Sequence, residues 1–137
     1  EDLHISGVPE IFIKVASSKP AANLSVWLVS LPWTEGRRSK ITDNLINRTW
    51  ADIQNYKSLY ESEPLEPGKF YSLKFNFQPD DQVIKAGQQI GLMIMGSDKD
   101  FTLRPEPGTE LTIDLDGTVL RLPIVGGAEA YQKAIEK

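Results

Sequence analysis

The sequence contains no cysteine and a single histidine, His4, and both scarcities limit the chemistry available to the chain. Without thiols the chain can form neither disulfide bonds nor thiolate metal sites. A zinc site is not expected either, because structural zinc is held mainly by cysteine and histidine ligands. We therefore expect a fold stabilised by its packed core rather than by covalent or metal cross-links.

Long apolar runs and a basic stripe are also missing. The longest apolar stretches, Leu24–Trp33 and Ile90–Gly96, are much shorter than the roughly 20 residues of a membrane-spanning helix. The net charge is −4 and the 15 lysine and arginine residues are spread along the chain, whereas a nucleic-acid surface needs clustered basic residues. We expect neither a membrane span nor a nucleic-acid partner. The absence of cysteine does not fix the compartment, because many exported proteins also lack cysteine.

The length suits one domain and is too short for two well-packed ones, since the chain has 137 residues. Hydrophobic residues make up 40% and charged residues 25%, which is the balance of an ordinary globular protein. We predict a single domain over residues 1–137. Because the sequence begins at Glu1 rather than at a methionine, we expect it to be a fragment of a larger chain.

Apolar and polar side chains alternate along several segments, which is the pattern of a β-strand with one wet face. Glu10–Ala16, Phe70–Gln78 and Thr109–Leu115 show this alternation. Two further segments, Leu24–Leu31 and Ile90–Met95, are apolar at successive positions and therefore on both faces. We predict that these two are central strands. Antiparallel sheets with one solvated side follow from the pattern.

A turn is predicted at Asp116-Gly117, between Thr109–Leu115 and Thr118–Ile124. An Asp-Gly pair flanked by alternating segments favours a two-residue hairpin in which the glycine has a positive φ. In this hairpin Leu115 would point inward.

Two segments do not have strand periodicity. Pro32–Asn47 is long and polar, and we predict an irregular surface loop there. Ala128–Lys137 has apolar residues at helical spacing after two glycines, which predicts a short terminal helix. The number and spacing of the strands predict an all-β fold: an antiparallel β-sandwich or jelly roll, like that of galactose-binding domains, with a short C-terminal helix.

The residues needed for a complete active site are not found. Acyl transfer requires a nucleophile, a base and a group that orients the base. No serine lies in a Gly-x-Ser-x-Gly motif and no Ser-x-x-Lys spacing occurs, while His4 lies near the start of the sequence. We interpret His4 as a polar residue on an edge strand. No catalytic residue is predicted, and the isolated domain is not expected to be an enzyme.

Three acidic clusters could in principle bind calcium, since Ca²⁺ prefers carboxylate oxygens. They are Asp114-Leu115-Asp116-Gly117, Asp80-Asp81 and Asp98-x-Asp100. The first resembles part of an EF-hand loop but lacks its third acid and its distant glutamate. We expect solvated turn carboxylates at all three and predict no metal or cofactor, with a structural Ca²⁺ left as the alternative.

Aromatic residues next to the predicted loop are the remaining functional signal. Trp33 follows the segment Leu24–Leu31, and Trp50 follows the loop that carries Arg37 and Arg38. Exposed tryptophan can anchor a neighbouring domain or stack on a sugar, and it can also close the end of a core. We predict Trp33, Arg37, Arg38 and Trp50 as domain-interface residues, because the loop is long enough to reach a neighbour.

The order and spacing of several runs resemble one known family. These runs are Ile5-Ser6-Gly7-Val8-Pro9-Glu10-Ile11, Val15-Ala16-Ser17-Ser18, Arg48-Thr49-Trp50-Ala51-Asp52, Pro64-Leu65-Glu66-Pro67-Gly68, Phe77-Gln78-Pro79-Asp80-Asp81 and Ser97-Asp98-Lys99-Asp100-Phe101. From His4 to Gly127 the sequence is similar to the C-terminal jelly-roll domain of Xaa-Pro dipeptidyl-peptidases and their cocaine-esterase-like relatives.

The resemblance implies a parent enzyme that removes an N-terminal dipeptide when proline is the second residue. In that family the catalytic Ser, Asp and His lie on an upstream α/β-hydrolase domain, and none of the three has a counterpart here. The resemblance further implies that this domain packs against the catalytic body and helps to wall the active-site entrance. Peptide substrate would then meet this chain only through the parent enzyme. The resemblance also implies a bacterial protein, either cytoplasmic or secreted, with secretion slightly favoured by the branch of the family.

Two other classes of function stay open at this point. The jelly-roll architecture is shared with carbohydrate-binding modules, although a shared fold is weak evidence for function. An adhesion or interaction domain acting alone is the third possibility. Strands apolar on both faces, with tryptophans near loops, predict an apolar surface patch that a neighbour normally covers.

Overall fold

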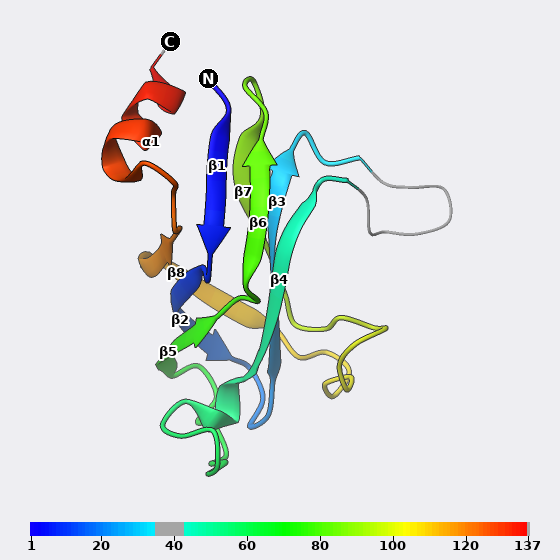
Figure 1. Cartoon of the computed structure of the whole chain (residues 1–137). Helices are drawn as coiled ribbons and strands as arrows, with labels where there is room; N and C mark the ends of the chain where they lie inside the picture. The colour runs from blue at the N-terminus through cyan, green and yellow to red at the C-terminus, as the bar shows by residue number, and fades with distance from the viewer. Residues whose placement is uncertain (35–42, 137) are drawn as a thin grey trace.

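The computed structural model describes residues 1–34 and 43–136. These residues form eight β-strands, one short 3-10 turn and one helix, and all strand pairings among them are antiparallel. The predicted fold class, an all-β sandwich with a short C-terminal helix, is confirmed (Figure 1). The elements are β1 (Leu3–Gly7), β2 (Glu10–Ser17), β3 (Asn23–Leu31), β4 (Leu45–Asp52), η1 (Ile53–Asn55), β5 (Phe70–Asn76), β6 (Asp80–Ile84), β7 (Gln89–Met95), β8 (Leu111–Arg121) and α1 (Gly127–Ile135).

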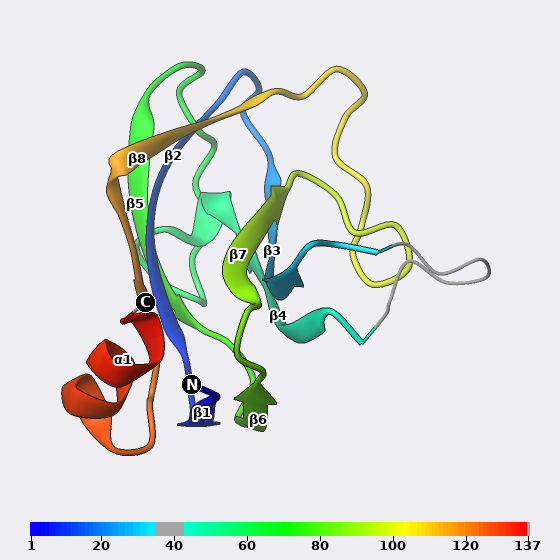
Figure 2. The ribbon, with the colours of Figure 1, turned by 90° about the horizontal axis from the view of Figure 1, so that it is seen from above.

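Two three-stranded sheets form the layers of the sandwich (Figure 2). One sheet has the strand order β5–β2–β8 and the other β4–β3–β7, while β1 and β6 form a separate two-stranded ladder. The central strands β2 and β3 supply the middle of the core, with Ile11 and Ile13 from β2 and Val26 and Leu28 from β3. All four side chains are fully buried. Burial of this kind is the main stabilising term of the fold.

The alternation predicted for Glu10–Ala16 and Phe70–Gln78 is confirmed in β2 and β5. Along β2 and β5 the apolar positions face one another across the ladder and point into the core. The pairs are Ile11 with Phe75, Ile13 with Leu73 and Val15 with Tyr71. The polar positions of β5 are exposed. The two-residue side-chain period is sufficient to fix the register here, because a slip by one residue would turn every apolar side chain outward.

The two strands predicted to be central behave differently. β3 is central in its sheet and nearly all of its residues are buried, as predicted. β7 was expected to be central as well, and this prediction is wrong, because β7 is the last strand of the sheet β4–β3–β7. Six of its seven residues are only half-buried. A strand that is apolar on both faces therefore does not need two paired neighbours in its sheet.

The hairpin predicted at Asp116-Gly117 is wrong, since β8 continues through this dipeptide without reversing. The register of β8 against β2 shifts between Phe12 and Lys14, so that β8 carries a bulge at this point. Leu115, which was expected to point inward, lies in the bulge and is 76% exposed. The Asp-Gly pair does mark a local change of the backbone, but this change is the bulge within β8 and not a turn between two strands.

Gly117 is needed at the bulge because Lys14 approaches it closely. A Cβ atom on Gly117 would lie 2.7 Å from Cδ of Lys14, which is closer than such atoms pack. Lys14 in turn forms an ion pair with Asp114, with Nζ and Oδ2 2.7 Å apart, and the Asp114 carboxylate also accepts a hydrogen bond from the amide of Gly117. The carboxylate and the glycine together shape the bulge.

The predicted terminal helix is confirmed as α1, which lies beside β1 (Figure 1). It begins after Gly126, whose φ of 83° is in the left-handed region that favours glycine. Ala134 packs against the core, whereas Tyr131 and Ile135 are exposed. None of the helices in the described part of the chain is long and apolar enough to cross a membrane.

The predicted loop Pro32–Asn47 is shorter than expected, because residues 45–47 already belong to β4. Residues 35–42 of this loop lie outside the described residues.

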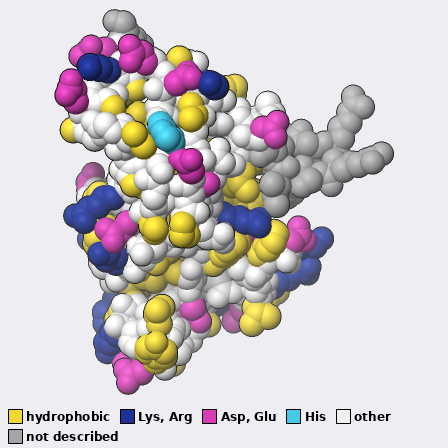
Figure 3. All heavy atoms as spheres, in the orientation of Figure 1, with side chains coloured by type: hydrophobic (Ala, Val, Ile, Leu, Met, Phe, Trp, Pro, Cys, Tyr) yellow, Lys and Arg dark blue, Asp and Glu magenta, His cyan; other side chains and the backbone are white. Residues whose placement is uncertain are grey.

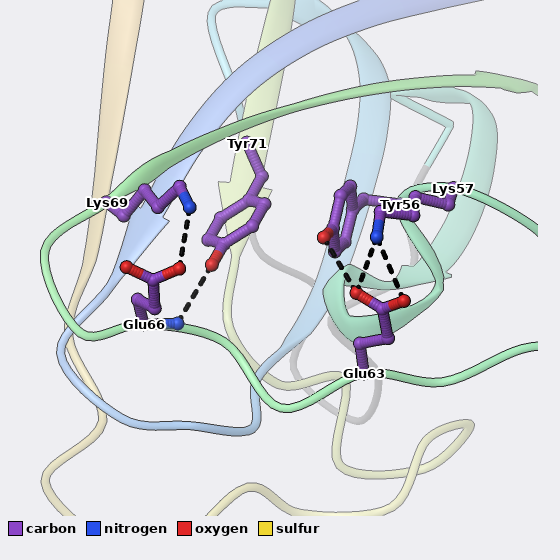
Figure 4. A network of polar contacts seen from close by, with 6 residues as sticks. All are labelled: Tyr56, Lys57, Glu63, Glu66, Lys69 and Tyr71. Carbon is purple, nitrogen blue, oxygen red and sulfur yellow. Dashed lines mark hydrogen bonds and ion pairs between the residues drawn. The ribbon is translucent and has the colours of Figure 1, made fainter.

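A network of polar contacts fixes the segment between η1 and β5 (Figure 4). The Tyr56 hydroxyl and the Lys57 ammonium both donate to the Glu63 carboxylate, at 3.0 and 2.8 Å. The ring of Tyr56 contacts the ring of Tyr71 on β5, with centroids 4.5 Å apart. The buried Tyr71 hydroxyl accepts a hydrogen bond of 2.9 Å from the amide of Glu66. The segment is thereby held against the sheet.

Replacing Tyr71 by phenylalanine should lower the free energy of unfolding by about 1 kcal/mol, because the Glu66 amide loses its acceptor while the ring packing remains. Urea denaturation followed by fluorescence measures the change. Tyr60→Phe is the control, since Tyr60 is 95% exposed and should give no measurable change. Equal stabilities of the two variants would show that the Glu66 amide is adequately solvated without Tyr71.

Candidate interdomain surface

The outer face of the sheet β4–β3–β7, which points away from the core, carries a cluster of large side chains. The register places Trp27 of β3 opposite Arg48 of β4 and opposite Met93 of β7. On an antiparallel sheet such opposite residues share a face. We call this surface the indole face and define it by six residues: Trp27, Trp33, Arg48, Trp50, Asp98 and Phe101.

Asp98 joins two of the tryptophans. Its Oδ2 atom accepts a hydrogen bond of 3.1 Å from Nε1 of Trp27 and one of 3.2 Å from Nε1 of Trp50. The Asp98 side chain is buried, so these two donors replace the water that would otherwise solvate the carboxylate. The ring of Trp33 extends the cluster, with its centroid 6.1 Å from that of Trp27.

Arg48 lies against two aromatic rings that also contact each other. The guanidinium carbon lies 3.9 Å from the ring centroid of Phe101 and 5.3 Å from that of Trp50, which are cation–π distances. Its Nη1 atom is buried and has no hydrogen-bond partner among the described residues, and the same is true of the Ser25 hydroxyl on this face. Buried polar groups are normally paired. This outer face thus contains hydrogen-bonding groups that the described residues do not pair.

The loop after β7 is fixed on the indole face. The Thr102 hydroxyl accepts a hydrogen bond from the Asp98 amide, and the Asp98 carbonyl accepts from the amides of Phe101 and Thr102. Asn23 of β3 donates to the carbonyl of Leu103 at 2.6 Å. The loop nevertheless leaves apolar surface open, since Phe101 is 49% exposed and Leu103 is 87% exposed.

The structure brings together two of the four residues predicted for an interface. Trp33 and Trp50 both belong to the indole face and are half-buried. Arg37 and Arg38 lie outside the described residues. The other members of the indole face were not predicted. They are Trp27, Arg48, Asp98 and Phe101, and the one sequence signal for them was the apolar character of both faces of β3.

The outer face of the other sheet is different in character. There Glu10 of β2 pairs with Lys74 of β5 at 2.6 Å and with Arg121 of β8 at 3.3 Å. Both cations lie over the ring of Phe12, at 5.1 and 4.7 Å from its centroid. A face of this kind is compatible with solvent. The sandwich therefore has one charged outer face and one aromatic outer face.

The single histidine contacts a carboxylate on the neighbouring strand. His4 of β1 lies at the surface (Figure 3), and its Nε2 atom contacts the Asp81 carboxylate of β6. In a serine triad the imidazole also contacts a hydroxyl nucleophile, whereas in the described part of the chain the hydrogen-bond partner of the His4 ring is the Asp81 carboxylate. His4 acts as a cross-strand contact between β1 and β6.

The acidic clusters considered for calcium are used in other ways. Asp114 pairs with Lys14, Asp81 pairs with His4, and the Asp98 carboxylate accepts from two indoles. Within residues 1–34 and 43–136, no group of three or more acidic or histidine side chains is arranged to hold a metal ion.

Stability should fall on acidification because several carboxylates form ion pairs in the folded protein. Hydrogen bonding from Lys74 holds the pKa of Glu10 below its ordinary value, and Lys14 does the same to the pKa of Asp114. A carboxyl group with a lowered pKa in the folded state binds fewer protons there than in the unfolded state. Its contribution is complete above the unfolded pKa of about 4 and is lost as the pH falls through the folded pKa.

The urea midpoint is therefore expected to stay nearly constant from pH 7 to about pH 5 and to fall below that. A Glu10→Gln variant should show a shallower fall between pH 5 and pH 3. If the two proteins had identical pH profiles, the Glu10 pairs would contribute nothing to stability.

The chain is similar to known proteins in both sequence and fold. Residues 1–135 match the family described as the X-Pro dipeptidyl-peptidase C-terminal non-catalytic domain. The chain is 62% identical over 127 residues to a putative Xaa-Pro dipeptidyl-peptidase of Rhodopirellula baltica, covering 93% of this chain and 20% of that protein. It is 42% identical over 125 residues to a putative Xaa-Pro dipeptidyl-peptidase of Bacillus anthracis, covering 91% and 19%. The chain thus spans about a fifth of the length of these curated relatives.

Solved structures share the fold at low sequence identity. An α-amino acid ester hydrolase superimposes with a TM-score of 0.73 at 16% identity, covering 91% of this chain and 24% of the other. A CocE/NonD family hydrolase from Staphylococcus aureus gives a TM-score of 0.64 at 14% identity, covering 91% and 29%. The predicted resemblance is confirmed by the family match over nearly the whole sequence. The chain belongs to the family of X-Pro dipeptidyl-peptidase C-terminal non-catalytic domains.

Proposed function

We propose that this chain serves as the non-catalytic C-terminal domain of a serine hydrolase that releases N-terminal Xaa-Pro dipeptides. In that protein the domain packs through its indole face against an upstream α/β-hydrolase domain. The contact stabilises the catalytic domain and shapes the entrance to its active site. Peptide substrate meets this chain only through the parent enzyme.

The family match supports the general role. Members are described as non-catalytic, and the relatives above are named dipeptidyl-peptidases that are about five times as long as the matched region. The chemistry of such a protein then belongs to the part outside this domain. The relatives and structures named above are peptidases and other hydrolases, so nothing among them supports the carbohydrate-binding alternative.

The observation that carries the proposal is the indole face. The outer face of an antiparallel sheet is usually polar when it meets solvent. Here it holds three tryptophans, a phenylalanine and a stacked arginine, and tryptophan and arginine are the residues enriched at the energetic centres of interfaces. Among the described residues the Nη1 atom of Arg48 has no acceptor, and a carboxylate or carbonyl of the catalytic domain would supply one.

The general role can be tested with a chimera in which this chain replaces the matching region of the Rhodopirellula baltica relative. We expect the chimera to hydrolyse Ala-Pro-p-nitroanilide, and this chain alone to show no turnover. The relative truncated before the matching region should lose thermal stability and activity. Turnover by this chain alone, or full activity and an unchanged melting temperature in the truncated protein, would contradict the proposal.

The indole face itself is tested by Trp33→Ala and Phe101→Ala in the chimera. Both variants should lower the melting temperature of the catalytic domain and raise KM, because both side chains have surface left for a neighbour. Tyr60→Ala is the matched control, an aromatic residue that is 95% exposed on a loop away from this face. Each variant is also measured in this chain alone, which separates lost docking from a destabilised domain. If all three variants behaved alike, the indole face would not be the contact.

A further inference from the structure

One side of the sandwich is less well closed than the other. On the side where β4 approaches the end of β5, Asn47 and Thr49 donate to the carbonyls of Gln78 and Asn76, and the neighbouring apolar side chains are buried. On the opposite side β7 approaches β8, as shown by the closeness of Gly96 to Leu111. There the core-facing residues are only partly buried: Ile90, Leu92 and Ile94 on β7, and Leu111, Ile113 and Leu120 on β8.

The free edge of β7 has the chemistry of a strand that normally pairs. Its sequence from Gln89 to Met95 contains no charged residue and no proline. Among the described residues, no strand pairs with its second edge. Other strands that end a sheet or ladder carry charges, such as Arg48 on β4, Lys74 on β5 and Asp81 on β6. Native proteins use such charges and bulges to prevent edge pairing, and the bulge on β8 protects that edge in the same way.

We propose that an apolar extended segment from the rest of the parent protein adds to the free edge of β7 as a fourth strand and covers the partly buried core-facing residues of β7 and β8, which we call the gap. The segment pairs its backbone with the outward amides and carbonyls of β7, and its side chains cover the partly buried residues of both strands. This inference rests on the proposed function, because it requires the domain to be joined to a larger hydrolase.

The rest of the parent protein is a more suitable source than a second copy of this chain. In the Rhodopirellula baltica relative the matched region is 20% of the protein, so four fifths of that chain are available and tethered nearby. A tethered segment acts at a high effective concentration and closes the gap in every molecule. A second copy, by contrast, would close it only at concentrations that favour association.

Hydrogen–deuterium exchange can test the added strand by comparing this chain with the chimera described above. Peptides covering β7 should exchange about tenfold or more slowly in the chimera, because the outward amides gain acceptors. Peptides covering β5 provide the internal control, since β5 is the edge strand of the sheet with the charged outer face, carries Lys74, and should exchange equally in both proteins. Equal exchange of β7 in both proteins would overturn the proposal.

Two neighbouring substitutions on β8 sharpen the test. Leu120→Lys places a charge among the partly buried residues of the gap and should remove the protection of β7 in the chimera. Val119→Lys is the matched control, because Val119 is half-exposed on the charged outer face and should leave the protection intact. Protection that appears in this chain alone and rises with its concentration would identify a second copy as the occupant and overturn the proposal.

The same experiment separates this inference from the proposed function. Slower exchange of residues 96–103 in the chimera would support docking of the indole face whatever happens at β7. Slower exchange at β7 without any change at residues 96–103 would support the added strand and contradict the docking surface.

Discussion

Replacing Asp98 by alanine should lower the free energy of unfolding by about 2–4 kcal/mol, because two indole donors lose their common acceptor. The Nε1 atoms of Trp27 and Trp50 both donate to Oδ2 of Asp98. Trp27 is buried, so water cannot readily replace the carboxylate there. The substitution also removes the contact that holds the loop of residues 96–103 on the sheet.

Chemical denaturation of this chain measures the effect, and two variants serve as controls. Asp98→Asn keeps one acceptor oxygen and should cost less than Asp98→Ala. Asp100→Ala removes an exposed carboxylate from the same loop and should have little effect. If Asp98→Ala were as stable as Asp100→Ala, the two hydrogen bonds would contribute nothing and the loop would be held by other contacts.

Replacing Trp27 by alanine should be the more damaging change, at about 3–5 kcal/mol, which is typical of a buried large aromatic side chain. Trp27 is 5% exposed, contacts the ring of Trp33 and lies opposite Arg48 and Met93. Its loss would leave a cavity on the outer face of β3 and would also free one lone pair of Asp98.

The two substitutions should be strongly non-additive. Trp27→Ala and Asp98→Ala remove the two ends of the same hydrogen bond, so the double variant should be more stable than the sum of the single effects predicts. Equilibrium unfolding of the three variants gives the coupling energy. Simple additivity would mean that the indole and the carboxylate stabilise the protein independently.

The parts of the fold that could be predicted are those in which local pattern and tertiary environment agree. β2 and β5 alternate cleanly because each has one face in the core and one in solvent. β3 is apolar on both faces because both of its faces are covered. The terminal helix begins at the second of two glycines, Gly127, and both Gly126 and Gly127 have the positive φ that glycine readily adopts.

The errors have a common physical origin. The sequence of β7 shows that its faces are apolar, but pairing of its edge depends on what lies beside it in space. At Asp116-Gly117 the local signal for a hairpin is overridden, because Lys14, about a hundred residues earlier, binds Asp114 and packs against the glycine. Whether a segment forms a strand depends mainly on its own sequence. Whether the strand lies at a sheet edge or contains a bulge depends on partners that are distant in sequence.

The same distinction applies to the indole face. Trp33 and Trp50 could be predicted from their positions beside the loop that follows β3. The role of Asp98 could not, because its partners Trp27 and Trp50 are 71 and 48 residues away. The sequence alone places Asp98 in an acidic cluster with Asp100. Its burial and its hydrogen bonds to two indoles depend on how the strands assemble into the sheet.

Coverage of the indole face by the catalytic domain is the central claim of the proposed function, and hydroxyl-radical labelling of the chimera measures it directly. Labelling of Trp33, Trp50 and Phe101 is compared between this chain and the chimera by mass spectrometry, with the 95% exposed Tyr60 as the reference. We predict that the three residues of the indole face are labelled several-fold more slowly in the chimera, while Tyr60 is labelled equally in both. Equal labelling of Trp33, Trp50 and Phe101 in the two proteins would contradict the account.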